Sequence, residues 1–527
     1  MKRTRLWSLA AAGFVMALVA GCSAGASSSG TDAGSEAGSA ASAVTTSAAA
    51  EGEQANASGK DTVTLALNAG APKNLDFTTT DGAAIPQALL GNVYQGLVAL
   101  NDAGEIVPVL AKSWTVSPDG LTYTFDLVDN ATFSNGDPFT AEDVKYSFEK
   151  VQSDAWTISL KSKMDVVDKI EVASPTQAVV TLKRPSNSWL YDMTTRVGAI
   201  FDQKATGDLA TEAVGTGPYV VSEFVPDTSL TLTARDDYWG TPPAVKTVTF
   251  QYNNDVNAQI AGMLSGSIDG IVSMQDLNTL DQFKSDDRFN VTEGTTTTKW
   301  TLSMNNGAGV FKDPKVRQAV NYAIDRQALL AAVTNGYGQV TGSFVPPTDP
   351  WFEDLSGDYP YDPEKAKALL KEAGAEGATI KFYVPNLPAA TSAAQVVKSD
   401  LEKVGINAEL IPSEFPAAWL DQVFTKKDYD MSLIGHVESR DLGVYADPNY
   451  YFQYDNPEVQ ALMASADSGT VEQQKVDLAK AMKIMSQDAA SDWLYLAANI
   501  NVVDKTLNGV PQNTASESLD VTQLSWS

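Results

Sequence analysis

Residues 214–240 place a glycine- and proline-rich bend before two stretches that alternate like strands. The segment begins Val-Gly-Thr-Gly-Pro-Tyr-Val-Val and ends Leu-Thr-Leu-Thr-Ala-Arg-Asp-Asp-Tyr-Trp-Gly. Glycines on both sides of Thr216, followed by Pro218, are typical of a tight bend that leads into a strand. The apolar residues of the second part alternate with threonines, so one face of that strand can be buried. The segment therefore predicts a β-hairpin that ends at an aromatic pair, Tyr238 and Trp239, in a structural corner.

The start of the chain has the layout of a secretory signal peptide. Three basic residues lie within positions 2–5, and an apolar run without charge follows over residues 6–20. This run is too short, and wrongly flanked, for a stable membrane span. It ends in Leu-Val-Ala-Gly-Cys22, which is similar to a bacterial lipobox, and Cys22 is the single cysteine of the chain. We expect residues 1–21 to be removed and Cys22 to become a lipidated amino terminus.

Residues 22–60 are expected to form a tether. After Cys22 the segment is almost entirely Ala, Ser, Gly, Thr and Glu, which cannot bury a core, so we expect it to be disordered.

Residues 61–527 have an ordinary globular composition and are numerous enough for two or three domains. The formal net charge of −28 should repel nucleic acid and favours solubility outside the cell. We expect a monomer without a nucleic-acid partner.

Catalytic motifs are scarce in this sequence. The chain has one histidine, His436, so a histidine pair for zinc is excluded and any Ser/His pair must use that ring. The one Gly-x-Ser-x-Gly pattern, at 21–25, has no strand before it, and no Gly-x-x-x-x-Gly-Lys-Ser/Thr phosphate loop is present. The chain is therefore not an ATP-hydrolysing subunit, and we expect no cofactor. Paired carboxylates leave an extracellular hydrolase as an alternative.

Several short patterns follow one another between residues 108 and 144. They are a proline, Ala-Lys-Ser-Trp, Asp-Gly, Phe-Asp-Leu, Phe-Ser-Asn-Gly and Thr-Ala-Glu-Asp-Val, in that order. Together with Gly-Thr-Gly-Pro-Tyr and the later Tyr-Trp-Gly, this order resembles the family 5 extracellular solute-binding proteins. These are the peptide- and nickel-binding subunits of ABC importers. The resemblance covers nearly all of residues 61–527.

The resemblance implies an α/β fold of the periplasmic-binding-protein type II class, with two lobes joined by a hinge and an additional N-terminal subdomain. We expect the hinge near residues 301–305 and 496–500. The expected divisions are 1–21, signal peptide; 22–60, lipidated Cys and disordered tether; 61–110, lobe I, first part; 111–213, extra subdomain of lobe I; 214–303, lobe I, second part; 304–495, lobe II; and 496–527, return to lobe I.

Local patterns give further expectations for the secondary structure. Apolar residues at helical spacing predict a helix over residues 88–100. Asp313 as N-cap, Pro314 at the first helical position and an apolar stripe predict one helix that continues to Gly336. From residue 380 onward, strands alternate with helices, which indicates an α/β lobe with parallel strands.

The segment that bears most directly on the solute is Gly-His-Val-Glu-Ser-Arg-Asp over residues 435–441. Peptide-binding members tend to read Gly-Trp-x-x-Asp, in which the aspartate holds the α-amino group of the peptide. Here His436 stands at the tryptophan, Ser439 stands where the aspartate is expected, and Glu438 and Asp441 flank it. A ligand ammonium needs a carboxylate in a closed cleft, and Glu438 is our first choice. His436 fits a ligand contact and a packed structural role equally well.

The sequence and the resemblance together lead to a lipid-anchored receptor on the extracellular face of the bacterial membrane. It would pass a small solute, with a peptide as the first expectation, to an ABC permease powered by ATPase subunits. A nickel or metallophore receptor is the alternative within binding, although one histidine supports it thinly. No catalytic residue and no metal ligand is assigned. The candidate ligand-binding residues are Asn74, Tyr94, Trp300, Asn305, Trp351, Trp419, His436, Glu438, Arg440 and Asp441.

Overall fold

The computed structural model describes residues 59–67, 70–80, 82–101, 103–253 and 255–527. The expected signal peptide, Cys22 and nearly all of the expected tether lie outside these described residues. Within the described ranges, no helix combines the length and the apolar character needed to cross a bilayer.

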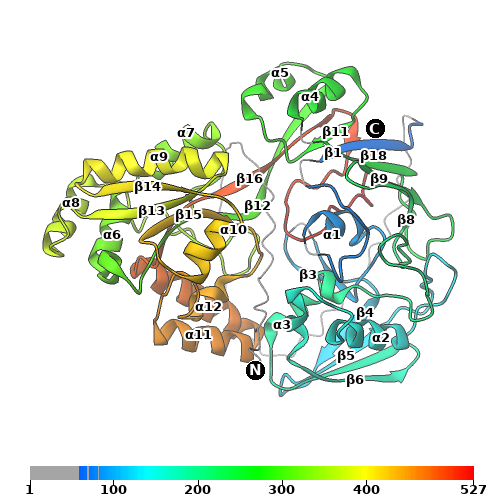
Figure 1. Cartoon of the computed structure of the whole chain (residues 1–527). Helices are drawn as coiled ribbons and strands as arrows, with labels where there is room; N and C mark the ends of the chain where they lie inside the picture. The colour runs from blue at the N-terminus through cyan, green and yellow to red at the C-terminus, as the bar shows by residue number, and fades with distance from the viewer. Residues whose placement is uncertain (1–58, 68–69, 81, 102, 254) are drawn as a thin grey trace, which may run out of the picture.

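One mixed sheet of ten strands runs through the whole molecule (Figure 1). Its two longest strands, β12 and β16, are neighbours in the sheet and antiparallel to each other. In order across the sheet, the strands are β14 (Asn407–Ser413), β13 (Thr379–Pro385), β15 (Met431–His436), β12 (Phe289–Met304), β16 (Ser491–Asp504), β11 (Gly270–Val272), β1 (Thr62–Leu67), β10 (Thr247–Tyr252), β9 (Ser229–Ala234) and β8 (Tyr219–Val225).

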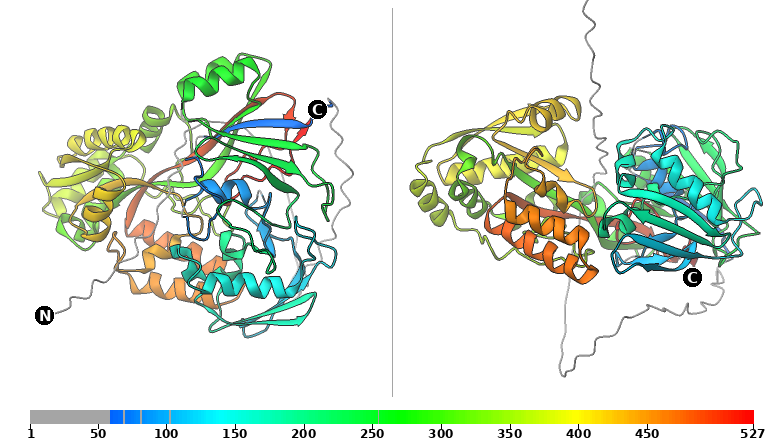
Figure 2. Two further views of the ribbon diagram at one scale, coloured as in Figure 1. Left: turned by 45° about the vertical axis from the view of Figure 1, so that its right-hand side comes forward. Right: turned by 90° about the horizontal axis from the view of Figure 1, so that it is seen from below.

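The part of the molecule that contains β1 and β8–β11 is called lobe I, and the part that contains β13–β15 is called lobe II. Figures 1 and 2 show the lobes side by side, with β12 and β16 passing between them. Lobe I also holds a separate four-stranded antiparallel sheet and two short hairpins. These strands are β4 (Ala111–Val116), β5 (Thr122–Leu127), β7 (Gln177–Leu182) and β6 (Val167–Ser174) in sheet order, then β2 (Val98–Leu100) with β3 (Ile106–Pro108), and β17 (Leu507–Asn508) with β18 (Ser525–Trp526).

Helices cover both lobes, with α1–α5 before β12 in the chain and α6–α12 packed around the strands of lobe II. Their bounds are α1 (Ala84–Leu89), α2 (Ala141–Gln152), α3 (Asn187–Asp192), α4 (Val256–Ser265), α5 (Leu280–Lys284), α6 (Pro314–Ala323), α7 (Arg326–Thr334), α8 (Pro363–Glu372), α9 (Pro388–Lys403), α10 (Ala417–Trp419), α11 (Pro457–Ser468) and α12 (Val471–Gln487).

The predicted hairpin is present as the antiparallel pair β8–β9. Its glycines are required by a close approach of two backbone segments. A Cβ atom on Gly215 would lie 2.0 Å from the carbonyl oxygen of Val93, and one on Gly217 would lie 2.4 Å from that of Asn92. The indole nitrogen of Trp239 donates to the carbonyl of Thr216 at 2.9 Å. The bend and the aromatic residue therefore form the structural corner that the sequence predicts.

Two predicted helices differ from the structure. The helix expected over residues 88–100 is wrong, because α1 ends at Leu89 and Gly91 has a φ of +75°, which breaks the helical path. The single helix expected from Pro314 to Gly336 is divided into α6 and α7. Asp325 separates them, and its carboxylate accepts a hydrogen bond from the backbone N–H of Ala328 at 3.0 Å, as an N-cap does.

The connection between the lobes contains an irregularity in the sheet. The register of β12 and β16 shifts between Thr295 and Lys299, so residues 296–298 leave the ladder opposite Ala497. The expected hinge position at 496–500 overlaps this irregularity. A second register shift lies between Trp300 and Thr301, at the edge of the other expected position, and Thr301 to Met304 also pair with β15 inside lobe II. Hinge motion at both positions stays a prediction.

Candidate functional site

A pocket of about 250 Å³ lies where lobe I, lobe II and the two connecting strands meet. Strand β12 contributes its irregular residues to the wall, lobe II contributes the segment after β15, and lobe I contributes α3 and its neighbours. The lining residues are Gly82, Ala83, Gln87, Leu160, Lys163, Tyr191, Thr195, Arg196, Val272, Ser273, Thr296, Thr297, Thr298, Val437, Glu438, Ser439, Asn499, Pro511, Asn513, Thr514, Ala515, Ser516, Glu517, Ser518 and Leu519.

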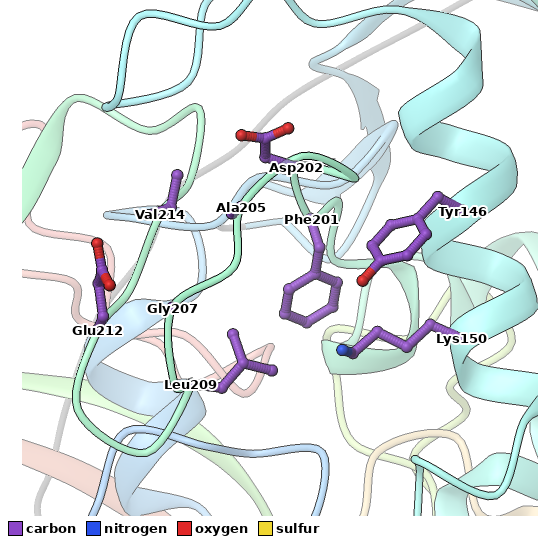
Figure 3. Close-up of a pocket in the computed structure, with 9 residues that line it drawn as sticks. All are labelled: Tyr146, Lys150, Phe201, Asp202, Ala205, Gly207, Leu209, Glu212 and Val214. Carbon is purple, nitrogen blue, oxygen red and sulfur yellow. The ribbon is translucent and has the colours of Figure 1, made fainter.

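A second hollow, shown in Figure 3, lies within lobe I between α2 and the 201–214 segment. Its volume is about 50 Å³, and Tyr146, Lys150 and Phe201 form one side of it. A space of this size holds one or two water molecules. No residue of lobe II lines it, so closure of the lobes would not enclose a solute there. The inter-lobe pocket is therefore the candidate site.

Hydroxyl and amide side chains are the most numerous kind on the wall of the inter-lobe pocket, although apolar atoms make up more of its exposed surface. Thr296, Thr297 and Thr298 face it from β12, and serine and asparagine residues face it from the other segments. The Thr297 hydroxyl donates to the carbonyl oxygen of Val437 at 2.6 Å, which joins the irregular part of β12 to lobe II. Such groups bind the polar parts of a small solute through hydrogen bonds in either direction.

Four acidic or basic side chains line the pocket, and three of them are paired within the chain. Arg196 is 4% exposed, and its guanidinium donates to Glu517 at 2.7 and 3.0 Å. Burial raises the pKa of the Glu517 carboxyl, but Arg196 outweighs this and holds it below its usual value. Lys163 pairs with Asp192. In each of these two pairs, the charge of one side chain is balanced by the opposite charge of its partner.

Glu438 is the remaining charged side chain. It follows β15, lines the pocket and is exposed there. No other side chain among the described residues donates a hydrogen bond to its carboxylate. The protein around it, and next the charge of Asp441, raise the pKa of Glu438. A positive group of a solute would relieve both effects, so this carboxylate is suited to bind a cation.

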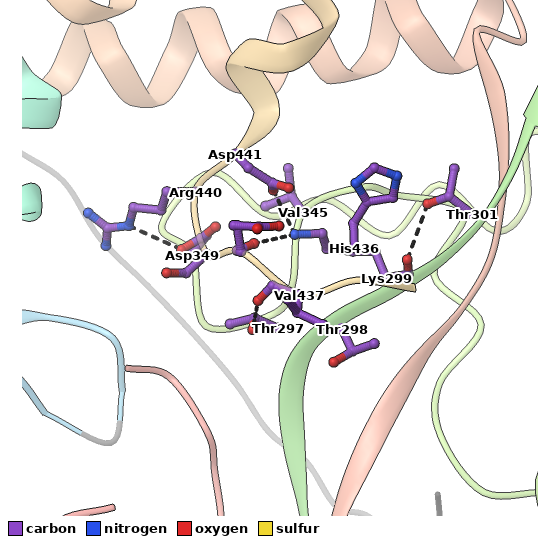
Figure 4. A network of polar contacts seen from close by, with 12 residues as sticks. Thr297, Thr298, Lys299, Thr301, Val345, Asp349, His436, Val437, Arg440 and Asp441 are labelled. Carbon is purple, nitrogen blue, oxygen red and sulfur yellow. Dashed lines mark hydrogen bonds and ion pairs between the residues drawn. The ribbon is translucent and has the colours of Figure 1, made fainter. Parts of the chain in front are cut away.

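Asp441 and Arg440 lie beside Glu438 but are held by internal partners (Figure 4). The Lys299 ammonium donates to the Asp441 carboxylate at 2.6 Å. The Arg440 guanidinium donates to Asp349 at 3.2 Å and lies 4.0 Å from the centre of the Tyr191 ring of lobe I. Both predicted residues thus support the pocket wall and do not face its interior.

His436 lies inside lobe II and does not line the pocket. It is 1% exposed, and its Nε2 is 2.9 Å from the Tyr451 hydroxyl oxygen. Burial, and then the charge of Lys299, lower the pKa of His436 to about 3, so the ring is neutral at pH 7. The packed structural role is the one that this arrangement fits. In the described part of the chain, no group of three or more His, Cys, Asp or Glu residues could hold a metal ion.

The predicted aromatic residues are distributed over the cores. Tyr94 packs against Phe77 in lobe I, Trp300 stacks on Tyr495 and Trp419 donates to Ser432 in lobe II. None of them lines the inter-lobe pocket in this structure.

The other three predicted positions also lie away from the wall. Trp351 lies under Arg440, with its ring centre 5.0 Å from the guanidinium carbon. Asn74 bonds to Thr80 in a loop, and Asn305 donates to the carbonyl of Tyr429 inside lobe II. Glu438 is therefore the one candidate from the sequence that the structure places on the wall.

Several lining residues have no local signal in the sequence. Lys163, Arg196 and residues 511–519 come together only through the topology, because the C-terminal segment returns to lobe I. Residues 295–298 are different. Four consecutive threonines interrupt the apolar alternation of β12, and this run marks the place where the strand leaves its ladder.

A second contact between the lobes lies at the C-terminal end of α11. The Asp467 carboxylate accepts hydrogen bonds from the Ser186 hydroxyl at 2.9 Å and from the Ser188 hydroxyl at 2.6 Å and backbone N–H at 3.1 Å. Arg184 pairs with the same carboxylate, and the Asn187 amide donates to the carbonyl of Ala466 at 2.8 Å. The start of α3 and the end of α11 are therefore joined directly.

Two α/β lobes, two connecting strands and a pocket between the lobes define a binding protein of the periplasmic-binding-protein type II class. A solved structure described as HbpA2 from Haemophilus parasuis has this fold. It superposes with a TM-score of 0.80 at 24% identity and covers 88% of this chain and 100% of that one.

The chain belongs to the bacterial extracellular solute-binding proteins, family 5, whose model matches residues 105–458. The dipeptide-binding protein of Escherichia coli is 29% identical over 371 residues, which are 64% of this chain and 68% of the relative. The nickel-binding periplasmic protein of Escherichia coli is 28% identical over 386 residues, 68% of this chain and 72% of the relative. The names of both relatives describe binding proteins.

Proposed function

We propose that this protein is a lipid-anchored receptor of an ABC importer that captures a peptide between its lobes. The receptor passes the peptide to the permease subunits, and the partner ATPase subunits drive the transport. Cys22 carries the lipid that holds the receptor at the outer face of the membrane. The names of the relatives support binding of a peptide or of nickel, and the charges of the pocket favour the peptide.

One observation carries the choice of a peptide. Glu438 is the acidic side chain of the pocket wall that has no partner side chain among the described residues, and hydroxyl and amide groups surround it. The terminal ammonium of a peptide pairs with this carboxylate, and the peptide groups form hydrogen bonds with the threonine wall. A nickel complex is a less suitable solute, because His436 is packed inside lobe II and no ligand cluster is present among the described residues.

Native mass spectrometry of receptor purified without added ligand identifies the retained solute. Calorimetry with that solute then compares Glu438→Gln with Glu472→Gln, which makes the same charge change on the exposed first turn of α12. Loss of a buried charge partner costs about 2–5 kcal/mol of affinity, so Glu438→Gln should weaken binding at least about thirtyfold. Glu472→Gln should bind like the wild type. Unchanged affinity in Glu438→Gln, or a retained metal complex, would exclude the peptide.

A further inference from the structure

A buried lysine lies immediately behind the pocket wall. Lys299 follows the three wall threonines of β12, and its side chain is 1% exposed. Its ammonium donates to the Asp441 carboxylate at 2.6 Å and to the main-chain carbonyl of Glu438. It also lies 4.7 Å from the centre of the Phe344 ring. Carboxylate, carbonyl and aromatic face together form a complete binding site for an alkylammonium group.

The charges around this lysine are nearly balanced. Three carboxylates, Asp349, Glu438 and Asp441, are close to Arg440 and Lys299. A third cation, Lys163, is paired with Asp192 and also acts on Glu438 and Asp441. Arg440 pairs with Asp349 and Lys299 pairs with Asp441, and both pairs are largely buried. Burial raises the pKa of Asp441, and the charge of Lys299 opposes that rise. Because the chain satisfies Asp441 itself, Glu438 alone stays available to a positive group of the solute.

We propose that Lys299 is an internal ammonium that determines specificity, because it occupies the Asp441 site and assigns the solute's cationic group to Glu438. Glu438 lines the pocket, and Asp441 lies behind the wall in the same short segment; without Lys299 the space beside Asp441 would open behind Glu438, and both carboxylates would then accept a cation. The receptor then distinguishes solutes with one positive group at this place from divalent or doubly charged ones. The inference rests on the proposed function only in that a solute ammonium binds in this pocket.

Chemical rescue tests the proposal without knowledge of the solute. Lys299→Ala removes three methylene groups and the ammonium, which together have the size of propylammonium. Thermal unfolding is followed in propylammonium chloride, with sodium chloride and propan-1-ol as controls for ionic strength and for apolar volume. We expect propylammonium to raise the melting temperature of Lys299→Ala by several degrees more than that of the wild type. Propan-1-ol should have no such effect.

The matched controls keep Glu438 intact, so any binding at that residue cancels in the comparison. The double variant Lys299→Ala/Asp441→Asn lacks the carboxylate and should respond only as the wild type does. Lys299→Met fills the apolar space and should not respond either. An equal response in the double variant or in Lys299→Met would overturn the proposal, and so would no response in folded Lys299→Ala.

If Lys299→Ala does not fold in plain buffer, recovery of the fold by propylammonium and not by propan-1-ol is the expected result, and failure of both overturns the inference. The two proposals can fail separately. Normal rescue with no retained peptide removes the peptide assignment alone. Peptide binding without rescue removes the role of Lys299 alone.

Discussion

Replacing Asp467 by alanine should open the receptor. The Asp467 side chain is 22% exposed and that of Arg184 is 61% exposed, so the ion pair itself contributes almost nothing. The hydrogen bonds from Ser186 and Ser188 end on a charged acceptor, and such bonds contribute about 1.5–3 kcal/mol each when well buried. For this partly exposed site we take about 2 kcal/mol in total, which lowers the ratio of closed to open receptor about thirtyfold.

Solution scattering and calorimetry measure the two consequences. Without solute, the radius of gyration of Asp467→Ala should exceed that of the wild type. With the retained solute, affinity should fall by up to about thirtyfold, because binding must then supply the energy of closure. Glu458→Ala is the matched control, since it removes an exposed acid from the same helix that pairs with Lys480 inside lobe II. If both variants match the wild type in size and affinity, these hydrogen bonds do not hold the lobes together.

Three further predictions concern the pocket and the anchor. Affinity for a cationic solute should rise with pH up to the raised pKa of Glu438 and stay constant above it, because protonation of this carboxylate removes the partner charge. The rise should be at most about tenfold per pH unit. Calorimetry should show no such pH dependence in Glu438→Gln. Arg196→Met leaves the partly buried Glu517 without its partner and should lower the free energy of unfolding, by at most about 3–5 kcal/mol, in denaturant titrations. Arg196→Met/Glu517→Leu should recover most of this loss, and an equally unstable double variant would contradict this account. Cys22→Ala should release the protein from the cell envelope, as measured by fractionation, and unchanged membrane association would place the anchor elsewhere.

Local chemistry predicted the parts of the fold that depend on neighbouring residues. The glycines beside Thr216 gave the corner before β8, and Asp313 with Pro314 gave the start of α6. The prediction of a helix over residues 88–100 is wrong, because the apolar spacing there comes from burial in a segment that is not helical. Val93 and Leu97 are buried in an irregular segment that packs in the core of lobe I, and periodicity alone does not distinguish the two arrangements.

The site was predictable only in its one local segment. The pattern around residues 435–441 predicts Glu438 as the carboxylate that binds a ligand ammonium, and the structure places this residue on the wall of the inter-lobe pocket. The role of His436 depends on Tyr451 and Lys299, which are distant in sequence, so no local pattern could decide it. Glu517 reaches the pocket because the chain returns to lobe I, and that return is a property of the topology.

The irregular pairing at residues 296–298 links two properties that an engineer would prefer to adjust separately. These threonines form part of the pocket wall, and they are also the residues of β12 that leave the ladder between the lobes. A substitution there should change both the shape of the pocket and the stiffness of the connection. New specificities are therefore better sought in the segment 511–519, which lines the same pocket without belonging to either connecting strand.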